Sequence, residues 1–348
     1  MKKTIGIVFG GKSAEHEISI LSCRNVFKNL DKSKFIPYLI FIDKSGGWHE
    51  SDESQLNQRE FKPSPLQINL SSGQFSIINN QNIFILIDVF FPVLHGPNGE
   101  DGSIQGLFEV GNVAYVGPGI AGSAIAMDKE IAKSLLKQAG IKVADYKTLY
   151  SYKPYSAEEI VRDLKLPLVI KPSRAGSSVG ITKVKHIDEL DDAIKLAFQF
   201  DYKILAEEYI KGREIEVAVL GNDNPIASLP GEIVSDFYDY HEKYSSESKT
   251  KLEAPAKLPE NVLPDFQYLA IKTFKALDCE GMSRVDFFLT QNDIFVNEVN
   301  TIPGFTNISM YPKLFELSGI PQAELITKLI EFAIERQERK NLLKSSLF

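Results

Sequence analysis

"TIGIVFGGKSAEHEISILSCRNVFKNL", Thr4 to Leu30, is the stretch of sequence from which the fold class can be read. Its first residues, Thr4 to Phe9, form an apolar run that predicts a buried strand. The polar, glycine-rich segment "GGKSAEHE" follows as a turn, and the apolar residues at positions 18, 20, 21, 26, 27 and 30 then have helical spacing. A strand, a glycine-rich turn and a helix in this order predict an α/β domain.

The next segments extend this first domain. "YLIFID" predicts a second strand, and the apolar run "IFILIDVFFPVL" at 83–94 predicts one strand that is buried on both faces. "SIQGLFEVGN" and a short strand "AYVG" complete the domain near residue 120. The polar stretch 44–81 has the weakest pattern. We expect an N-terminal domain with an open parallel sheet.

Length and composition narrow the class of protein. A chain of 348 residues is too long for one ordinary core and should divide into two or three domains. The net charge of -7 and the pI near 5.5 argue against nucleic acid as a partner. Cys23 and Cys279 form no C-x-x-C pair, and the run 83–94 is too short to span a bilayer. We expect a cytoplasmic protein that binds neither nucleic acid nor membrane.

After residue 120 the pattern becomes α+β. "AMDKEIAKSLLKQAG" predicts one helix that is closed by Gly140, and two strands, a helix and a further strand follow before residue 209. A third region carries the strand "EIEVAVL", a helix over 262–277 and two adjacent strands after it. The domains that we expect are 1–122, 123–212 and 213–348.

The loop "KPSRAGSSVG", Lys171 to Gly180, follows an apolar run and is suited to a bound phosphate. Glycines and serines expose backbone N–H groups and hydroxyls at close range, which phosphate oxygens require. The order of residues is not that of a Walker loop, because the lysine precedes the glycines. A solvated turn between two strands is an equally good interpretation of this stretch on its own.

The segment "SRVDFFLTQNDIFVNEVN", 283–300, predicts two strands joined by the turn "TQND". Residues two apart in a strand share a face, so Arg284 lies with Asp286 and Glu298 lies with Asn300. If the hairpin pairs, two carboxylates and an amide oxygen meet beside a guanidinium. Such hard oxygen ligands suit Mg²⁺. The alternative is a polar outer face of a hairpin with an Arg–Asp pair.

Together the loop and the hairpin indicate ATP, because they supply a phosphate cover and a metal platform. Between them lies "KILAEEYIKGREIEVAVL". Its acidic residues Glu207, Glu208 and Glu214 could accept the adenine amino group and the ribose hydroxyls, or could serve only as solubilising charges.

Several motifs occur in the order and spacing of one known family. They are "GGKSAEHEIS", "LHGPNGEDGSIQG", "AMDKEIAK", "KPSRAGSSVG", "FYDYHEKY", "RVDFF" and "NEVNTIPGF". Over nearly its whole length the chain resembles the D-alanine–D-alanine ligases of the ATP-grasp superfamily. The resemblance implies a three-domain ATP-grasp architecture and a homodimer.

The resemblance places ATP between the central and C-terminal domains, with two lysines and the "GSSVG" loop on its phosphates. The residues that it implies for the nucleotide are Lys129, Lys171, Ser178, Glu207, Tyr209, Ile210 and Glu214. It implies two Mg²⁺, for which Mn²⁺ can substitute, held by Asp286, Glu298 and Asn300, with Glu298 bridging.

The activity implied is the ligation of two D-alanines through a D-alanyl phosphate, for peptidoglycan precursors. The catalytic residues implied are Glu15, Ser177, Tyr244, Arg284 and Gly304, and the substrate-binding residues are His95, Lys243 and Ser309. Glu15 would hold the first ammonium, and Arg284 with the Gly304 N–H would stabilise an oxyanion. The segment 235–249 would be a lid carrying Lys243 and Tyr244.

Two other functions share part of this pattern. Another ATP-grasp carboxylate–amine ligase would have the ATP and metal residues but would lack "GGKSAEHE" and "FYDYHEKY". A nucleotide-binding module without catalytic activity would be expected to lack one of Arg284, Asp286, Glu298 or Asn300.

Overall fold

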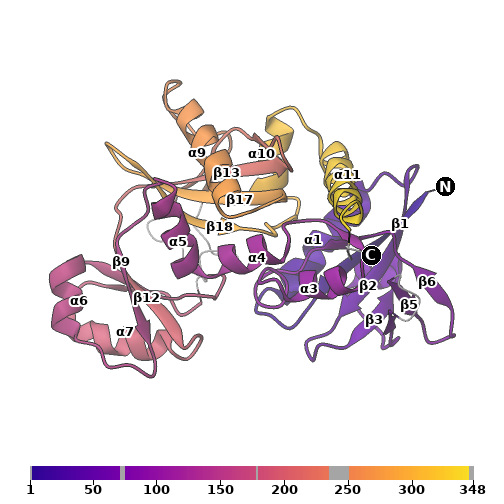
Figure 1. The fold of residues 1–348 in the computed structure, drawn as a ribbon, viewed down its shortest axis with the longest axis horizontal. Helices are drawn as coiled ribbons and strands as arrows, with labels where there is room; N and C mark the ends of the chain where they lie inside the picture. The colour runs from indigo at the N-terminus through magenta and orange to yellow at the C-terminus, as the bar shows by residue number, and fades with distance from the viewer. Residues whose placement is uncertain (1, 71–74, 178, 235–250, 345–348) are drawn as a thin grey trace.

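The computed structural model describes residues 2–70, 75–177, 179–234 and 251–344. The chain runs through an N-terminal part, a central part and a C-terminal part, which lie at the right, the lower left and the top of Figure 1. Each part is built on its own sheet. The division at residues 122 and 212 remains a prediction.

The N-terminal sheet has the strand order β3-β2-β1-β7-β8. Its strands are β1 (Lys3–Gly10), β2 (Phe35–Ile42), β3 (Trp48–Ser51), β7 (Val89–Pro92) and β8 (Ala114–Tyr115). β2, β1, β7 and β8 are parallel, and β3 is an antiparallel edge strand on β2. The helices are α1 (His16–Asn29), α2 (Glu53–Gln58) and α3 (Ser103–Val110). The strand, turn and helix expected from Thr4 to Leu30 are therefore confirmed.

The single buried strand expected over 83–94 is wrong, because the structure has two strands there. β6 (Phe84–Leu86) pairs into a small antiparallel sheet with β4 (Gln67–Asn69) and β5 (Ser76–Ile78), while β7 joins the main sheet. The chain changes sheet at Asp88, whose Oδ2 accepts from the Thr4 N–H at 2.7 Å. Phe84 and Leu86 consequently stay exposed.

The central sheet is antiparallel, in the order β11-β10-β12-β9. Its strands are β9 (Tyr146–Tyr150), β10 (Leu168–Pro172), β11 (Thr182–Val184) and β12 (Lys203–Glu208), with helices α6 (Ala157–Leu164) and α7 (Leu190–Ala197). Their apolar faces form one core that includes Leu168, Ile170 and Ile194.

The one helix expected around "AMDKEIAKSLLKQAG" is in fact two, α4 (Ile120–Met127) and α5 (Lys129–Gln138). Asp128 has an extended backbone between them and caps α5, since its side chain accepts from the Ile131 N–H. Gly140 follows α5 with a φ of +68°, as its predicted role in closing the helix requires.

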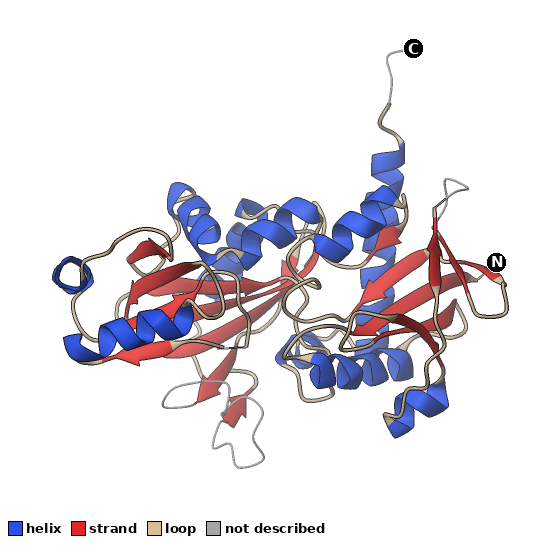
Figure 2. Ribbon diagram, turned by 90° about the horizontal axis from the view of Figure 1, so that it is seen from below, coloured by secondary structure: helices blue, strands red, loops and turns tan. Residues whose placement is uncertain are grey.

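The C-terminal sheet has the order β16-β15-β13-β17-β18, with β14 on β13. Its strands are β13 (Arg213–Gly221), β14 (Ile226–Ala227), β15 (Gly231–Val234), β16 (Lys251–Glu253), β17 (Gly281–Leu289) and β18 (Ile294–Asn300). The helices are α9 (Leu263–Ala276), α10 (Met310–Leu317) and α11 (Gln322–Asn341). Figure 2 shows the strands in two main groups, each flanked by helices.

Helix α11, near the C-terminus, packs on the N-terminal part of the molecule, because it contributes to a core that also contains β1, β7 and α1. Arg336 donates to the carbonyl oxygens of Tyr115 and Gly117 and stacks on the Tyr115 ring at 4.2 Å. These contacts hold the C-terminal helix on the N-terminal sheet, as the position of α11 in Figure 1 shows. No helix among the described residues is long and apolar enough to cross a membrane.

Candidate active site

The strands β17 and β18 form the expected hairpin, with a one-residue register shift between Asp286 and Phe287. Arg284 is opposite Asn300, and Asp286 is opposite Glu298. The Arg284 guanidinium donates two bonds of 2.7 Å to Asp286, and Asn300 Nδ2 donates to Asp286 Oδ2 at 3.0 Å. A carboxylate on the next strand, Glu216 of β13, lies 3.2 Å from Arg284. The hairpin therefore brings all four predicted residues to one face.

Lys129 lies at the start of α5 and points toward the hairpin. Its Nζ donates to the Ala175 carbonyl at 2.9 Å and lies 3.6 Å from Glu298 Oε2. Its backbone N–H donates to the Ser173 carbonyl at 3.0 Å. One lysine thus connects the predicted metal platform to the predicted phosphate loop.

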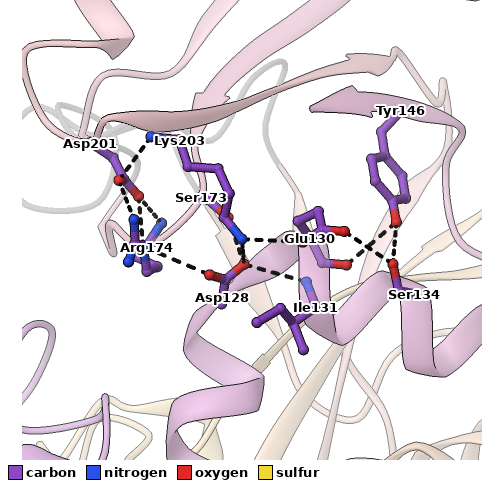
Figure 3. A network of polar contacts seen from close by, with 9 residues as sticks. All are labelled: Asp128, Glu130, Ile131, Ser134, Tyr146, Ser173, Arg174, Asp201 and Lys203. Atoms are coloured by element: carbon purple, nitrogen blue, oxygen red, sulfur yellow. Dashed lines mark hydrogen bonds and ion pairs between the residues drawn. The ribbon is translucent and has the colours of Figure 1, made fainter. Parts of the chain in front are cut away.

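A polar network fixes the root of that loop (Figure 3). The Asp128 carboxylate accepts from Ser173 Oγ at 2.9 Å and pairs with Lys203 Nζ at 2.7 Å. Arg174 forms a two-pronged pair with Asp201, with bonds of 3.2 and 2.8 Å. Because Asp128 precedes Lys129 directly, the network sets the position of Lys129 relative to the loop.

The phosphate loop itself has backbone geometry that favours small residues. Ser177 has a φ of +52° and Gly180 a φ of +72°. A Cβ at position 180 would lie 2.6 Å from the Phe200 ring. Ser178, the third predicted loop residue, lies outside the described residues.

Glu207 is buried between two lysines. It forms ion pairs with Lys171 of β10 and with Lys133 of α5, and all three side chains are buried. Burial acts to raise the pKa of Glu207, but the charges of Lys133 and Lys171 outweigh it and hold the pKa below its usual value. Glu207 is therefore ionised at neutral pH.

A cavity of about 300 Å³ lies between the central and C-terminal sheets. Of the predicted nucleotide residues, it is lined by Lys171, Glu207, Tyr209, Ile210 and Glu214. These five predicted residues therefore line one and the same cavity, as a nucleotide site requires.

A larger cavity, of about 860 Å³, is lined by the predicted catalytic residues Glu15, Ser177 and Gly304 and by the predicted substrate-binding residues His95 and Ser309. Glu15 is the N-cap of α1 and makes no side-chain cap hydrogen bond. A Cβ on Gly96 would lie 3.3 Å from Glu15 Oε2, and one on Gly176 would lie 3.4 Å from it. The two glycines give this carboxylate its place in the cavity wall.

His95 contacts protein groups with both ring nitrogens. Nδ1 lies 3.0 Å from the Ile302 carbonyl, which can only accept, so Nδ1 carries the proton. Nε2 then accepts from Ser22 Oγ at 3.1 Å. Burial lowers the pKa of His95, so the neutral form is favoured. In this structure His95 connects β7 to the loop after β18.

Ser309 and Gly304 lie against each other. Ser309 Oγ accepts from the Thr306 N–H at 3.0 Å, and a Cβ on Gly304 would lie 2.9 Å from that oxygen. A side chain at position 304 would therefore displace the serine. The other two predicted residues, Lys243 and Tyr244, lie outside the described residues together with the rest of the predicted lid.

The two cavities share four lining residues: Glu216, Ile233, Arg284 and Glu298. The cavity lined by the predicted nucleotide residues and the cavity lined by the predicted substrate residues therefore meet at the hairpin β17–β18. Arg284 lies at this junction and is paired with Asp286 and Glu216. Lys129 lines the larger cavity beside it and is paired with Glu298.

Asp286, Glu298 and Asn300 provide oxygen ligands of the type that Mg²⁺ prefers. Within the described ranges, no group of three or more His, Cys, Asp or Glu could hold a metal by itself. Two carboxylates and one amide leave the rest of a Mg²⁺ shell to phosphate oxygens and water. The donor set thus suits a metal that arrives with the nucleotide.

Sequence reasoning missed several residues that shape the site. Glu100 accepts from the N–H groups of Gly96 and Ile302, at 2.7 and 3.2 Å. Burial and the nearby charge of Glu15 raise the pKa of Glu100 to about 8, although both hydrogen bonds act in the opposite direction. Glu216 could have been found, because it shares a strand face with Glu214. Glu100 has no such local signal.

Comparisons with known proteins agree with these observations. Family models described as D-ala D-ala ligase N-terminus and C-terminus match residues 4–118 and 135–331. The chain is 50% identical to the D-alanine–D-alanine ligase of Oceanobacillus iheyensis, covering 99% of each protein. It is 46% identical to D-alanine–D-alanine ligase A of Salmonella typhimurium, covering 99% of this chain and 100% of that one.

Solved structures give the same result. The D-alanine–D-alanine ligase of Coxiella burnetii matches with a TM-score of 0.87 and 38% identity, over 98% of this chain and 96% of that one. The VanG D-Ala:D-Ser ligase of Enterococcus faecalis matches with a TM-score of 0.88 and 40% identity, over 96% of this chain and 100% of that one.

Proposed function

This chain belongs to the D-alanine–D-alanine ligase family, whose ATP-grasp fold it has, and from this we propose that it joins two D-alanines at the expense of ATP. The product is D-alanyl-D-alanine, a precursor for peptidoglycan. The observation that carries the proposal is the meeting of the two cavities at Arg284 and Glu298. A ligase that activates a carboxylate with ATP needs the two sites to be contiguous.

We assign the smaller cavity to the nucleotide. Glu207 accepts the adenine amino group, the backbone of Tyr209 and Ile210 faces the base, and Glu214 holds the ribose. Lys171 of this cavity and Lys129, which lines the adjoining larger cavity, bind phosphate oxygens. The loop with Ser177 and Ser178 covers these oxygens. Both lysines are buried, which supports these roles. The effective dielectric constant is lower away from water, so the attraction between an ammonium group and a phosphate is stronger there.

Two Mg²⁺, or Mn²⁺ as a substitute, would be held by Asp286, Glu298 and Asn300. When bound, such ions neutralise the charge that spreads over the transferred phosphoryl group. Arg284 is paired with Asp286 and Glu216, so its guanidinium is held rigidly at the junction of the cavities. This arrangement supports a role in charge stabilisation at that place.

We assign the larger cavity to the amino acids. Glu15 binds the ammonium of the first D-alanine, and His95 supports the wall beside it. The first carboxylate attacks the γ-phosphate, the bond to the β-phosphate oxygen breaks, and an acylphosphate and ADP result. The second amine then attacks the activated carbonyl, whose developing oxyanion is stabilised by Arg284 and the Gly304 N–H, while Ser309 holds the second carboxylate. The nitrogen loses a proton, the C–O bond to the phosphate breaks, and inorganic phosphate leaves with the peptide bond formed. By family resemblance, Lys243 and Tyr244 assist from the lid.

The acceptor is the part of this proposal that most needs a test, because one of the similar structures is a D-Ala:D-Ser ligase. The experiment is ADP release with D-alanine, L-alanine, D-serine and D-lactate, with products identified by mass. We expect ADP release when D-alanine is the only amino acid added, with the D-alanine dipeptide as the product. A protein that requires D-serine as its second substrate would overturn the acceptor assignment, and no ADP release with any D-amino acid would overturn the ligase assignment.

We further propose that the protein is a cytoplasmic homodimer. The support is its family membership and its use of ATP. Light scattering of the purified chain tests the dimer, and a mass equal to one chain across micromolar concentrations would contradict it.

A further inference from the structure

Lys133 is a fully buried lysine that the proposed reaction does not use. It lies on α5, one turn after Lys129, and its relative exposure is 1%. Lysine is almost never fully buried unless it is paired. Within the described part of the chain its one ion pair is with Glu207, and it lines neither cavity. It therefore lies behind Glu207, on the side away from the nucleotide.

The two lysines on Glu207 occupy different environments. Lys133 pairs with Oε1 from behind, whereas Lys171 pairs with Oε2 and itself lines the smaller cavity. Lys171 also lies 3.4 Å from Asn297 Oδ1, next to Glu298. Lys171 can thus turn to a phosphate that enters the cavity, while Lys133 has no route to that phosphate.

If Lys171 turns to bind the phosphate, Lys133 is the cation that remains to balance the buried charge of Glu207. A buried carboxylate that loses both partners is strongly destabilised and becomes neutral. With Lys133 in place, one opposite charge remains on the carboxylate when the nucleotide is bound. This division of roles explains why two buried cations meet one buried anion.

We propose that Lys133 is a positioning residue that holds the Glu207 carboxylate for the adenine amino group and thereby sets the preference for adenine over purines with a carbonyl at that place. The proposal rests on the proposed function, in which Glu207 faces adenine. An ionised carboxylate only accepts hydrogen bonds, and the adenine amino group donates one. Hypoxanthine presents a carbonyl there, so two acceptors would face each other without a proton between them.

A protonated Glu207 would behave in the opposite way, because its hydroxyl could donate to the hypoxanthine carbonyl. The charged groups that act on this carboxyl are Lys133 from α5 and Lys171 from β10, and Glu298 of β18 acts on Lys133. Burial lowers the pKa of Lys133 to about 8, so the lysine is charged at the lower pH of the test.

The test compares ATP with inosine triphosphate in the full-length protein. In the parent, we expect the ratio of kcat/KM for ATP to kcat/KM for ITP to be the same at about pH 6 and about pH 7.5. In Lys133→Met, the ratio should fall by about tenfold or more and should fall further at the lower pH, since Glu207 becomes protonated. A ratio within about twofold of the parent at both pH values overturns the proposal.

The matched control is Lys137→Met. Lys137 is one turn further along α5, is partly exposed and pairs with Asp145 at 2.8 Å instead of with Glu207. The same substitution there should leave the ratio unchanged at both pH values. A fall in the ratio as large as that in Lys133→Met would show a general effect of the helix and would also overturn the proposal.

A second variant keeps the test decisive if Lys133→Met does not fold. The double variant Lys133→Met with Glu207→Gln leaves no unpaired buried charge from this pair. If Lys133 acts through Glu207, this variant and Glu207→Gln alone have the same ATP-to-ITP ratio, with no dependence on pH. A clear difference between the two ratios contradicts the proposal.

The ratio of the dissociation constants for ATP and ITP, measured without amino acids, separates this inference from the proposed function. A parent that binds ATP selectively but releases no ADP with D-alanine would refute the ligase activity. The ratio of dissociation constants in Lys133→Met, compared with the parent, would then decide the role of Lys133. A parent that ligates D-alanine with an unchanged binding ratio in Lys133→Met would refute only the role of Lys133.

Discussion

Substitution of Lys203 by methionine tests whether the network of Figure 3 holds the central part of the molecule together. Lys203 Nζ lies 2.7 Å from Asp128 Oδ1 and 3.2 Å from Glu130 Oε2. Lys203 and Asp128 are both buried, with relative exposures of 7% and 5%. Methionine keeps the length of the side chain and removes the charge, so it leaves the Asp128 carboxylate without its cationic partner at that oxygen.

The magnitude follows from what remains around Asp128. Breaking a buried ion pair by removing one partner costs about 3–5 kcal/mol. Asp128 keeps hydrogen bonds from Ser173 Oγ at 2.9 Å and the Ile131 N–H at 3.3 Å, and Arg174 lies 3.7 Å away. These donors offset part of the loss. We therefore expect the free energy of unfolding to fall by about 2–3 kcal/mol.

Urea unfolding followed by circular dichroism measures this loss, with Lys195→Met as the matched control. Lys195 pairs with Asp192 at 3.1 Å on the surface, where both side chains are largely exposed, so its loss should be within about 0.5 kcal/mol. Adding Asp128→Asn to Lys203→Met should recover part of the stability, because the unpaired charge is then absent. The reasoning is refuted if Lys203→Met loses no more stability than Lys195→Met.

Three further outcomes are expected. Glu298→Gln should lower kcat by at least about a hundredfold, roughly 3 kcal/mol, with an unchanged circular dichroism spectrum, and turnover within about tenfold of the parent would contradict its metal role. Gly122→Ala should destabilise the protein by about 1–3 kcal/mol, because the new Cβ would lie 2.4 Å from the Asp278 carbonyl oxygen. In the control Gly106→Ala the new Cβ meets nothing within 4 Å, so this variant should be slightly more stable than the parent. Equal effects of the two variants on thermal unfolding would be inconsistent with this packing. Because burial lowers the pKa of His95, the unfolded chain binds a proton that the folded protein does not, and stability is lost as the pH falls below about 6.5. His95→Gln should lose less stability than the parent between about pH 7.5 and about pH 5.5 in urea titrations, and identical losses would exclude this role.

The sequence by itself determined the features that depend on local periodicity. Residues two apart share a strand face, so the sequence placed Arg284 with Asp286 and Glu298 with Asn300. The one-residue register shift between Asp286 and Phe287, which sets the two pairs opposite each other, was visible only in the structure. The strand, glycine-rich turn and α1 followed in the same way from Thr4 to Leu30. Each of these depends on residues that are close in the chain.

Only the tertiary structure decided the features that depend on partners far away in the chain. The run 83–94 divides at Asp88 because Thr4, 84 residues earlier, offers its backbone N–H. The helix expected around "AMDKEIAK" is interrupted at Asp128 because that carboxylate also binds Ser173 and Lys203.

The same distinction applies to the candidate site. Lys129 and the phosphate loop could be identified from their motifs, whereas Lys133 is part of the same motif and its role is visible only where Glu207 of β12 meets it. Glu100 and His95 likewise contact Ile302, which is more than 200 residues away. A hydrogen bond or an ion pair depends on distance in space, and sequence patterns report only on neighbours along the chain, so these groups could be located only after the sheets were packed.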